Sequence, residues 1–189
     1  VIDQSRDGKV PYSPTKITDK LQSTILGYVA DPPRDSMGHT RFLACLKYRQ
    51  GGASTTGALA FYAKAQYNPG WEHITAADTK DRADYLFERV MVNHNEWPEQ
   101  LKVPLRNANQ QRMLAWQNDS KMLVVSGRTR GAGIGKSPSS FSASEVPLWD
   151  DMAGQWNYLW PAIANRENHI HLQESTPFPM HEPSAEWFK

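Results

Sequence analysis

The residues of this chain that are best suited to chemistry lie at positions 47–55, where two glycines are followed by hydroxyl side chains. The preceding residues, 41–48, have the apolar composition of a buried strand, and residues 54–66 have that of a helix. A strand, a tight glycine turn and a helix N-terminus together direct backbone N–H groups toward a phosphate. The segment therefore predicts a phosphate-binding loop in which the hydroxyl of Ser54 can bind Mg²⁺.

The lysine of the common phosphate loop is missing from its usual position. Ala53 stands where the pattern G-x-x-x-x-G-K-[ST] has its lysine. Lys47 and Arg49 lie just upstream and could supply the positive charge, and an arginine suits a bidentate grip on phosphate. A plain strand-to-helix turn, in which the glycines serve close packing, is the alternative. On this segment alone the two interpretations are equally supported.

A second glycine-rich segment, residues 131–137, contains a literal G-K-S and competes for the same role. Its spacing is wrong, because Arg130 occupies the position of the first Walker A glycine. Pro138 follows the serine directly, and no helical pattern begins there, so the loop lacks the helix N-terminus that attracts anions. We interpret it as a solvated loop. Contact of Arg128, Arg130 and Lys136 with DNA phosphates or a neighbouring subunit is the minority alternative.

Carboxylates stand at the ends of two later strands. Glu145 ends the predicted strand 140–146, where an acidic residue can orient or deprotonate the water that attacks a γ-phosphate. The triplet at 174–176, Glu-Ser-Thr, follows the predicted strand 169–173. Each has a plainer explanation when taken singly, namely a solvent-facing glutamate or a turn. Three polar strand ends in this order favour a phosphate site.

The remaining elements come from hydrophobic spacing and turn residues. Predicted helices cover residues 18–30, 54–66, 78–94 and 152–163, and predicted strands cover 41–48, 71–77, 112–116, 121–126, 140–146 and 169–173. Asp78 is the expected cap of the third helix, and residues 117–120 are the expected turn of a hairpin. Strands that alternate with helices predict a mostly parallel sheet covered on both faces, with ligands at the carboxyl ends of its strands.

The composition bounds the class of protein. A chain of 189 residues with a net charge of +1 fits one domain and neither requires nor excludes nucleic acid. No apolar run is long enough to span a bilayer, and the N-terminus has no signal-peptide pattern, so nothing indicates secretion. The single cysteine, Cys45, excludes an internal disulfide and a zinc site of several cysteines. Its apolar neighbours predict a buried, inert thiol.

Three segments together resemble the ATPase domain of the large terminase of tailed bacteriophages, the motor that pumps DNA into the capsid. Residues 47–54 resemble the family's variant Walker A motif, often R-Q-x-G-x-[ST], in which the lysine is displaced upstream. Residues 141–149 resemble its Walker B end, where S-E can replace D-E, and residues 171–176 resemble its coupling motif. The resemblance implies an α/β fold, a P-loop NTPase of the RecA-like (ASCE) type, which is a three-layer sandwich with a mostly parallel central sheet.

The resemblance also implies a domain organisation. Residues 1–16 are expected to form an extended N-terminal segment, and residues 17–189 the P-loop ATPase domain. The second domain of the family, a metal-dependent nuclease, would follow Lys189 and is expected to be absent from this chain. We therefore expect this chain alone not to cut DNA.

A role follows for each residue that matches the family's motifs. Arg49 and Glu145 are the expected catalytic residues, with Arg49 on the γ-phosphate and Glu145 on the attacking water. Ser54 is expected to bind Mg²⁺ directly, and Glu145 to reach the ion through water. The expected coupling residues are Glu174, Ser175 and Thr176. The expected ATP contacts are Gln22, Lys47, Arg49, Gln50, Gly51, Gly52, Ala53, Ser54 and Thr55. For Gln22, which has the place of the family's adenine-contacting glutamine, a surface position is nearly as good an explanation.

The function implied is that of a packaging motor. ATP and Mg²⁺ are the expected cofactors, and hydrolysis is expected to translocate double-stranded DNA into a procapsid in the cytoplasm of the host cell. The expected partners are double-stranded DNA, the portal protein and the small terminase subunit, without a membrane. We expect a homo-oligomeric ring on the capsid and leave open a monomer in isolation.

The chain also departs from the family's pattern. Ser144 stands where the Walker B aspartate is usual, so Mg²⁺ has to rely on Ser54, phosphates and waters. The strand before it, residues 139–144, is more polar than a standard buried Walker B strand. Together with Ala53, these departures predict weak nucleotide affinity in the isolated domain.

Other functions compete with this interpretation. A metal hydrolase could use His169, His171, His181 and Glu182. A solvent-exposed strand face with surface histidines is the favoured explanation, because no third ligand has convincing spacing. A zinc deaminase is excluded, since the H-x-E at residues 94–96 lacks its P-C-x-x-C partner. Another P-loop DNA motor of the helicase kind, and a catalytically weak DNA-binding or assembly module that keeps the P-loop shape, remain open.

Overall fold

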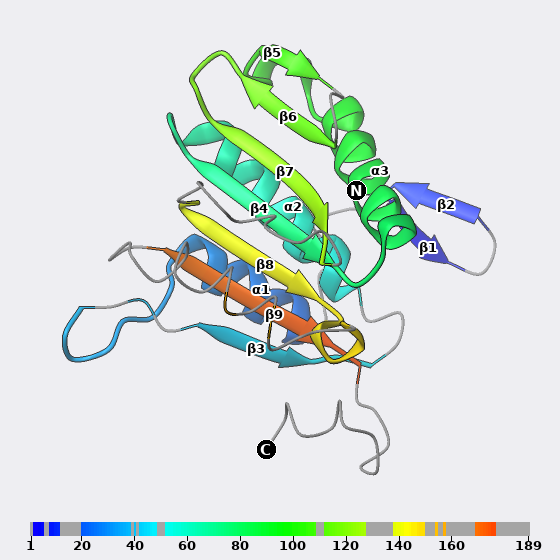
Figure 1. Ribbon diagram of the computed structural model, residues 1–189. Helices are drawn as coiled ribbons and strands as arrows, with labels where there is room; N and C mark the ends of the chain where they lie inside the picture. Colours follow the sequence, from blue (N-terminus) through cyan, green and yellow to red (C-terminus); the bar gives the residue numbers. More distant parts are fainter. Residues whose placement is uncertain are drawn as a thin grey trace.

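The computed structural model describes residues 2–5, 8–11, 20–38, 40, 42–48, 52–108, 112–127, 138–149, 154, 157 and 169–176. Its main sheet has seven strands in the spatial order β3-β9-β8-β4-β7-β6-β5 (Figure 1). These strands are β3 (Leu43–Leu46), β4 (Glu72–Ala77), β5 (Leu105–Ala108), β6 (Met113–Trp116), β7 (Lys121–Ser126), β8 (Ser140–Ser144) and β9 (Ile170–Ser175). Neighbours from β3 to β7 are parallel, and β7, β6 and β5 are antiparallel. The predicted mostly parallel sheet is confirmed.

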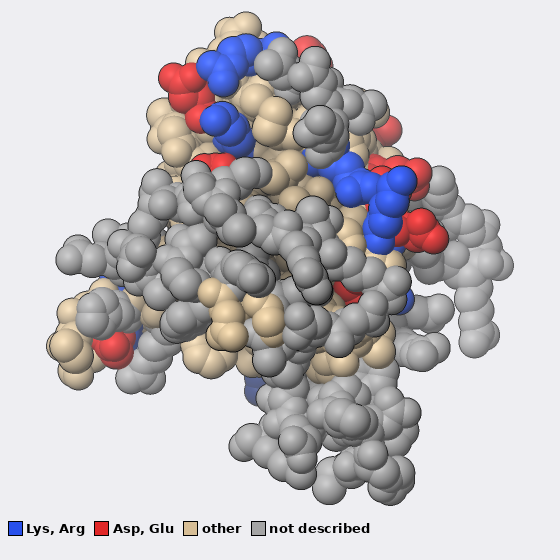
Figure 2. Space-filling model, viewed as in Figure 1, with Lys and Arg blue, Asp and Glu red and all other residues tan. Residues whose placement is uncertain are grey.

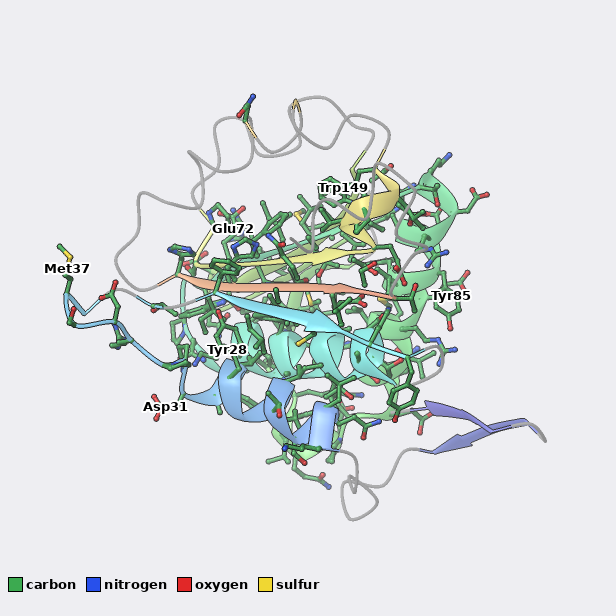
Figure 3. The ribbon with its side chains drawn as sticks, turned by 90° about the horizontal axis from the view of Figure 1, so that it is seen from below. Tyr28, Asp31, Met37, Glu72, Tyr85 and Trp149 are labelled. Carbon is green, nitrogen blue, oxygen red and sulfur yellow. The ribbon has the colours of Figure 1, made fainter. Side chains whose placement is uncertain are left out.

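Three helices of the described part of the chain lie on one face of this sheet. They are α1 (Lys20–Ala30), α2 (Ala53–Tyr67) and α3 (Lys80–Glu96). α2 lies in the middle, against β4, β7, β8 and β9, and packs on α1 and on α3. Figure 3 shows α1 and α2 on the same side of the sheet, with Tyr28 on that side and Trp149 on the other. The helix predicted at 152–163 lies outside the described residues, apart from positions 154 and 157, which are helical.

The remaining described elements are short. β1 (Ile2–Ser5) and β2 (Gly8–Pro11) form a separate antiparallel pair, and two 3₁₀ turns, η2 (Glu99–Leu101) and η3 (Val146–Leu148), follow α3 and β8. None of the helices described by the structure has the length and apolar content needed to cross a bilayer.

Apolar burial holds the helix layer on the sheet. Phe61 and Tyr62 of α2 are fully buried, and α3 contributes Leu86, Phe87 and Val90 to the same core cluster. Burying each such side chain contributes about 1.5–3 kcal/mol relative to leaving it in water. A smaller cluster lies on the opposite face. Its members are Ile74, Ala76, Phe141, Ala143, Val146 and Trp149. The two clusters fix the sheet from both sides and so set the position of its strand ends.

Two local expectations were wrong. The strand near residue 45 was expected to be buried, but among the described strands β3 lies at the edge of the sheet beside β9, and Leu46 is 56% exposed while Cys45 is buried. Asp78 was expected to cap α3, but Thr79 is the cap, because its extended backbone lets its Oγ1 accept a bond from the N–H of Arg82 at 3.2 Å. Asp78 instead pairs with Arg82, Oδ1 to Nε at 3.1 Å.

The polar strand β8 is buried because its hydroxyls have partners. His73 of β4 bonds through Nδ1 to Ser140 Oγ at 2.8 Å and through Nε2 to Thr75 Oγ1 at 2.9 Å. Ser142 Oγ joins this network at 3.0 Å from Thr75 Oγ1, and the ring of Phe61 stacks on His73 with centroids 4.0 Å apart. Satisfied buried polar groups cost little, so a serine-rich strand can lie in the core.

Acid is expected to destabilise the fold through two buried histidines. Burial lowers the pKa of His73 from 6.5 to about 3, and burial with the nearby charge of His169 does the same for His171. The unfolded chain takes up these protons near pH 6.5 and the native fold only near pH 3, so this stability is present above pH 6.5 and is lost as the pH falls. Urea unfolding should show a loss of about 2 kcal/mol per histidine between pH 6.5 and 5.

The control for this prediction is a matched pair of variants. His73→Asn should weaken the pH dependence of unfolding, whereas His169→Asn, at a half-buried position before β9, should leave most of it. An equal pH dependence in the His73 variant and the unchanged chain would contradict the assignment.

Candidate functional site

The site lies where β3, β8 and β9 end, beside the N-terminus of α2. Gly52 caps α2 in a left-handed conformation, with φ of 71°, and its carbonyl accepts the first helical bond from Thr56 N at 2.8 Å. Glycine is needed here for that φ, and a Cβ would lie 2.6 Å from Nε2 of Gln22. No side chain of the described residues caps α2 at Gly52. The start of α2 therefore offers backbone N–H groups and a positive dipole end to an anion.

Lys47 reaches the centre of this site from the end of β3. Its Nζ donates to Ser54 Oγ at 2.8 Å and forms ion pairs with Glu145, at 3.2 Å from Oε1, and with Oε2 of Glu174. The Lys47 side chain is only 11% exposed. Its backbone N–H donates to the carbonyl of Ser175 at 2.9 Å, which extends the β3–β9 ladder and holds the residue in place. Of the two upstream cations, Lys47 is the one that the described residues place in the loop.

Glu145 is held rigidly at the end of β8. It has a left-handed backbone, with φ of 53°, an uncommon and strained conformation for a residue with a side chain. Its Oε2 accepts from Ser175 Oγ at 2.8 Å, from Thr176 N at 3.1 Å and from Thr176 Oγ1 at 3.2 Å. Burial alone would raise its pKa, but the charge of Lys47 and these hydrogen bonds lower the pKa below its usual value. The carboxylate is therefore ionised at neutral pH and can accept a proton or orient a water.

Glu174 joins the phosphate loop to the last strand. Its Oε1 accepts a hydrogen bond from Ser54 Oγ at 2.8 Å, and its backbone carbonyl accepts one from Glu145 N at 2.8 Å. Glu174 is buried, and in the sheet it is paired with Cys45 of β3 on one side and with Ser144 of β8 on the other. The charge of Glu174 also affects Cys45: burial, with this neighbouring charge, raises the pKa of the thiol to about 11. The predicted inert cysteine is confirmed.

A small cleft lies between the start of α2 and the strands, and of these groups Ser54 and Glu174 line it. Its other lining residues are Ala53, Gly57, Ala58, Thr75, Leu86, Ser142, Ala143, Ser144 and Leu172. A Cβ on Gly57 would lie 3.1 Å from Leu172 Cδ2, which is a tight contact. Hydroxyl and carboxylate oxygens suit a hard cation such as Mg²⁺, and a glycine-capped helix start suits a phosphate. The residues present thus fit a phosphate group accompanied by a hard cation.

One residue of the site was missed from the sequence. Arg82, in the first turns of α3, lies 3.7 Å through Nη1 from Oε1 of Glu145 while it pairs with Asp78. The signal was available, since a strand-end aspartate four residues before an arginine at a helix start predicts an i,i+4 ion pair. What the sequence could not indicate is that this pair lies beside the end of β8.

The predicted site residues divide into two groups. The structure brings Lys47, Ser54, Glu145, Glu174, Ser175 and Thr176 together, with Gly52 and Ala53 at the start of α2 and Gln22 beside Gly52. Thr55 lies in the first turn of α2 and is half-buried. The predicted residues Arg49, Gln50 and Gly51 lie outside the described residues, as do Arg128, Arg130, Lys136 and the glycine-rich segment 131–137.

The histidines near β9 do not form the wet face that the sequence suggested. His171 is 1% exposed, with Gln173 Nε2 at 3.0 Å from its Nε2, because β9 is an interior strand with β3 and β8 on either side. His181 and Glu182 lie outside the described residues. Within the described part of the chain, no group of three or more His, Cys, Asp or Glu side chains could hold a metal ion.

Comparison with solved structures shows that the fold resembles that of bacteriophage large terminases. No family model and no curated protein sequence matches the chain. The crystal structure of the HK97 bacteriophage large terminase matches with a TM-score of 0.65 and 15% identity, over 92% of this chain and 36% of that one. The ATPase domain of the Thermus phage P74-26 large terminase matches with a TM-score of 0.59 and 18% identity, over 82% of this chain and 68% of that one.

A third similar structure holds a nucleotide. It is a large terminase from a thermophilic bacteriophage in complex with ADP, with a TM-score of 0.56 and 12% identity, over 83% of this chain and 38% of that one. The chain thus spans little more than a third of the length of the two longer terminases. Identities this low establish the fold rather than the activity. This chain has the fold of the ATPase domain of bacteriophage large terminases.

Proposed function

We propose that this chain is the ATPase domain of a large terminase, which hydrolyses ATP to translocate double-stranded DNA into a procapsid. The observation that carries the proposal is the cluster of Lys47, Ser54, Glu145 and Glu174. These residues come from three strand ends and the start of α2, and they meet in one buried site. A structural turn would not need a lysine and two carboxylates enclosed around a glycine-capped helix start.

In the proposed mechanism the phosphates of ATP lie on the N–H groups at the start of α2. Lys47, which is paired with two carboxylates in the structure, shifts its ammonium toward the phosphates when they arrive. Glu145 then orients the attacking water and accepts its proton. Mg²⁺, bound at Ser54 together with ATP, would neutralise charge that develops on the phosphates. Arg49 is proposed to contact the γ-phosphate as a second cation.

Coupling is proposed to start at the hydrogen bonds of Glu145. Its Oε2 takes three bonds from Ser175 and Thr176. When the carboxylate turns to a water, at least part of this set must break, and the end of β9 is freed to move. Hydrolysis is thereby reported to the chain that follows residue 176.

The proposed partners are double-stranded DNA, the portal protein, the small terminase subunit and further copies of the chain in a ring. Figure 2 shows basic and acidic side chains interspersed over the described part of one face, rather than one continuous basic surface. The described part of this face therefore offers DNA no continuous basic surface. A helicase-like motor remains the alternative, and turnover stimulated by single-stranded rather than double-stranded DNA would favour it.

The proposal is tested by Ser54→Ala, assayed by binding of a fluorescent ATP analogue with and without Mg²⁺. Ser54 Oγ bonds to two charged groups, and a hydrogen bond to a charged group contributes about 1.5–3 kcal/mol. Affinity in Mg²⁺ should fall by about 10-fold to 100-fold. Affinity in EDTA should fall much less.

The matched control is Ser36→Ala, at an exposed serine after α1, which should bind like the unchanged chain. If the unchanged chain bound no ATP with Mg²⁺, the ATPase assignment would be wrong, and the assembly module that merely keeps the P-loop shape would take its place.

A further inference from the structure

The carboxylate that a P-loop enzyme needs beside its Mg²⁺ is missing from the usual strand. In P-loop NTPases the ion is held by the loop's Ser or Thr and by an aspartate near the end of the Walker B strand. Here that strand is β8, and the residue before Glu145 is Ser144, which carries no charge. If the chain binds Mg²⁺ with ATP, another group has to supply the negative charge.

Glu174 occupies the neighbouring position on the next strand. β9 lies between β3 and β8, and the register pairs Glu174 with Ser144 on one side and with Cys45 on the other. Residues paired in this way project to the same face of a sheet, about 4.8 Å apart. Ser54, Ser144 and Glu174 accordingly line the same cleft. A carboxylate on β9 is one strand nearer to the phosphate loop than one on β8.

The contacts of Glu174 are those expected of that missing aspartate. Its Oε1 accepts the hydrogen bond of Ser54 Oγ at 2.8 Å, so it orients the hydroxyl that is proposed to bind Mg²⁺. Its Oε2 pairs with the ammonium group of Lys47, so a positive charge lies beside the carboxylate. Glu174 is 3% exposed. Of the other nearby carboxylates, Asp78 pairs with Arg82, and Glu145, which shares Lys47 through Oε1, has its Oε2 bonded to Ser175 and Thr176 and makes no described bond to Ser54.

We propose that Glu174 takes over the metal-positioning role of the absent Walker B aspartate, acting through Ser54 and through the waters around Mg²⁺. This inference rests on the proposed ATPase function, and it gives Glu174 a task in addition to coupling. Glu174 is a positioning residue rather than a catalytic one, because it acts on the ion through another side chain. Lys47 provides the positive charge at this carboxylate until Mg²⁺ arrives with ATP.

The test is the Mg²⁺ dependence of nucleotide binding by Glu174→Gln, with a fluorescent ATP analogue as the probe. The glutamine keeps the size of the side chain and can accept the bond from Ser54, but it has no charge for the ion. The Mg²⁺ concentration that gives half-maximal binding should rise about tenfold or more, with binding in EDTA unchanged. Glu72→Gln, at the opposite end of β4, is the matched control and should leave both values as they are.

Moving the carboxylate back to the usual strand gives the decisive variant. Ser144→Asp combined with Glu174→Gln should restore the Mg²⁺ dependence toward that of the unchanged chain, which a purely structural or coupling role of Glu174 does not predict. Binding of Mn²⁺ with ATP, followed by electron paramagnetic resonance, should show the same loss and the same recovery.

Three outcomes would overturn this inference. In the first, Glu174→Gln binds nucleotide with an unchanged Mg²⁺ dependence. In the second, it loses binding equally in Mg²⁺ and in EDTA, and in the third the double variant shows no recovery. Absence of any ATP binding by the unchanged chain would instead overturn the proposed function, and this inference with it.

Discussion

Replacing Glu145 with glutamine is expected to lower the rate of ATP hydrolysis by roughly 10²–10⁴-fold, the contribution typical of a positioned general base. Binding of ATP should change only a few-fold. The glutamine side chain has the same shape and can still accept bonds from Ser175 and Thr176, but it cannot take up the proton of the attacking water. The measurement is steady-state release of phosphate, alongside nucleotide binding by the same preparation.

The pH dependence of ATP turnover tests the ionisation state of Glu145 as well. Lys47 and the hydrogen bonds from β9 and Thr176 hold the pKa of Glu145 below its usual value of 4.5, so the base remains ionised down to that pH. Turnover should therefore show no ionisation of this group between pH 6 and pH 8. Glu99→Gln, at a carboxylate that is 83% exposed, is the control and should leave the rate unchanged. Undiminished hydrolysis by the Glu145 variant would remove the catalytic role assigned to this carboxylate.

The second large effect is expected from Lys47→Met, which should abolish measurable nucleotide binding and weaken the fold. Removal of Lys47 leaves Glu145 and Glu174 buried without their shared cation, and breaking a buried ion pair from one side typically costs about 3–5 kcal/mol. The pKa of Glu145 should rise at the same time, since its largest compensating charge is gone. Urea unfolding of the nucleotide-free protein at neutral pH measures the loss.

The sign of the pH effect distinguishes this explanation from a simple packing defect. The lowered pKa of Glu145 stabilises the native fold above pH 4.5, and this contribution is lost as the pH falls below that value. The difference in the free energy of unfolding between the Lys47 variant and the unchanged chain should therefore be greatest at neutral pH and should decrease in acid. Lys80→Met, at an exposed lysine that begins α3, is the control.

Comparing Lys47→Met with Arg49→Ala shows which of the two cations binds the phosphates. If Arg49→Ala abolished binding and Lys47→Met did not, Arg49 would be the principal cation, as the sequence first suggested. A Lys47 variant as stable as the unchanged chain would contradict the buried cluster itself.

Much of the fold was predictable because the signals are local. Helical spacing from Leu21 to Tyr28 indicated α1, and the polar residues 117–120 between two apolar runs indicated the β6–β7 hairpin, which the structure confirms. The strand-loop-helix order around Gly52 predicted a helix start, and α2 begins at the next residue. Such patterns depend on residues a few positions apart, so they can be recognised before the chain is folded.

The errors arose where a distant partner decides the outcome. β3 looked buried because its residues are apolar, but its place at the edge of the sheet follows from the strand order. His171 looked like a wet histidine, and it is buried because β3 and β8 enclose β9. The cap of α3 was misplaced by one residue, from Thr79 to Asp78, because both types cap helices and only the backbone geometry separates them.

The sequence alone identified the three polar strand ends, their order and the family that they resemble, because each motif consists of adjacent residues. Only the tertiary structure decided how they meet. It put β9 between the phosphate-loop strand and β8, and so brought Lys47 into contact with Glu145 and Glu174, which lie far from it in the sequence. Register and strand order are long-range properties, set by which faces become buried together. They made Lys47 the central cation of the described site and Glu174 the carboxylate on Ser54.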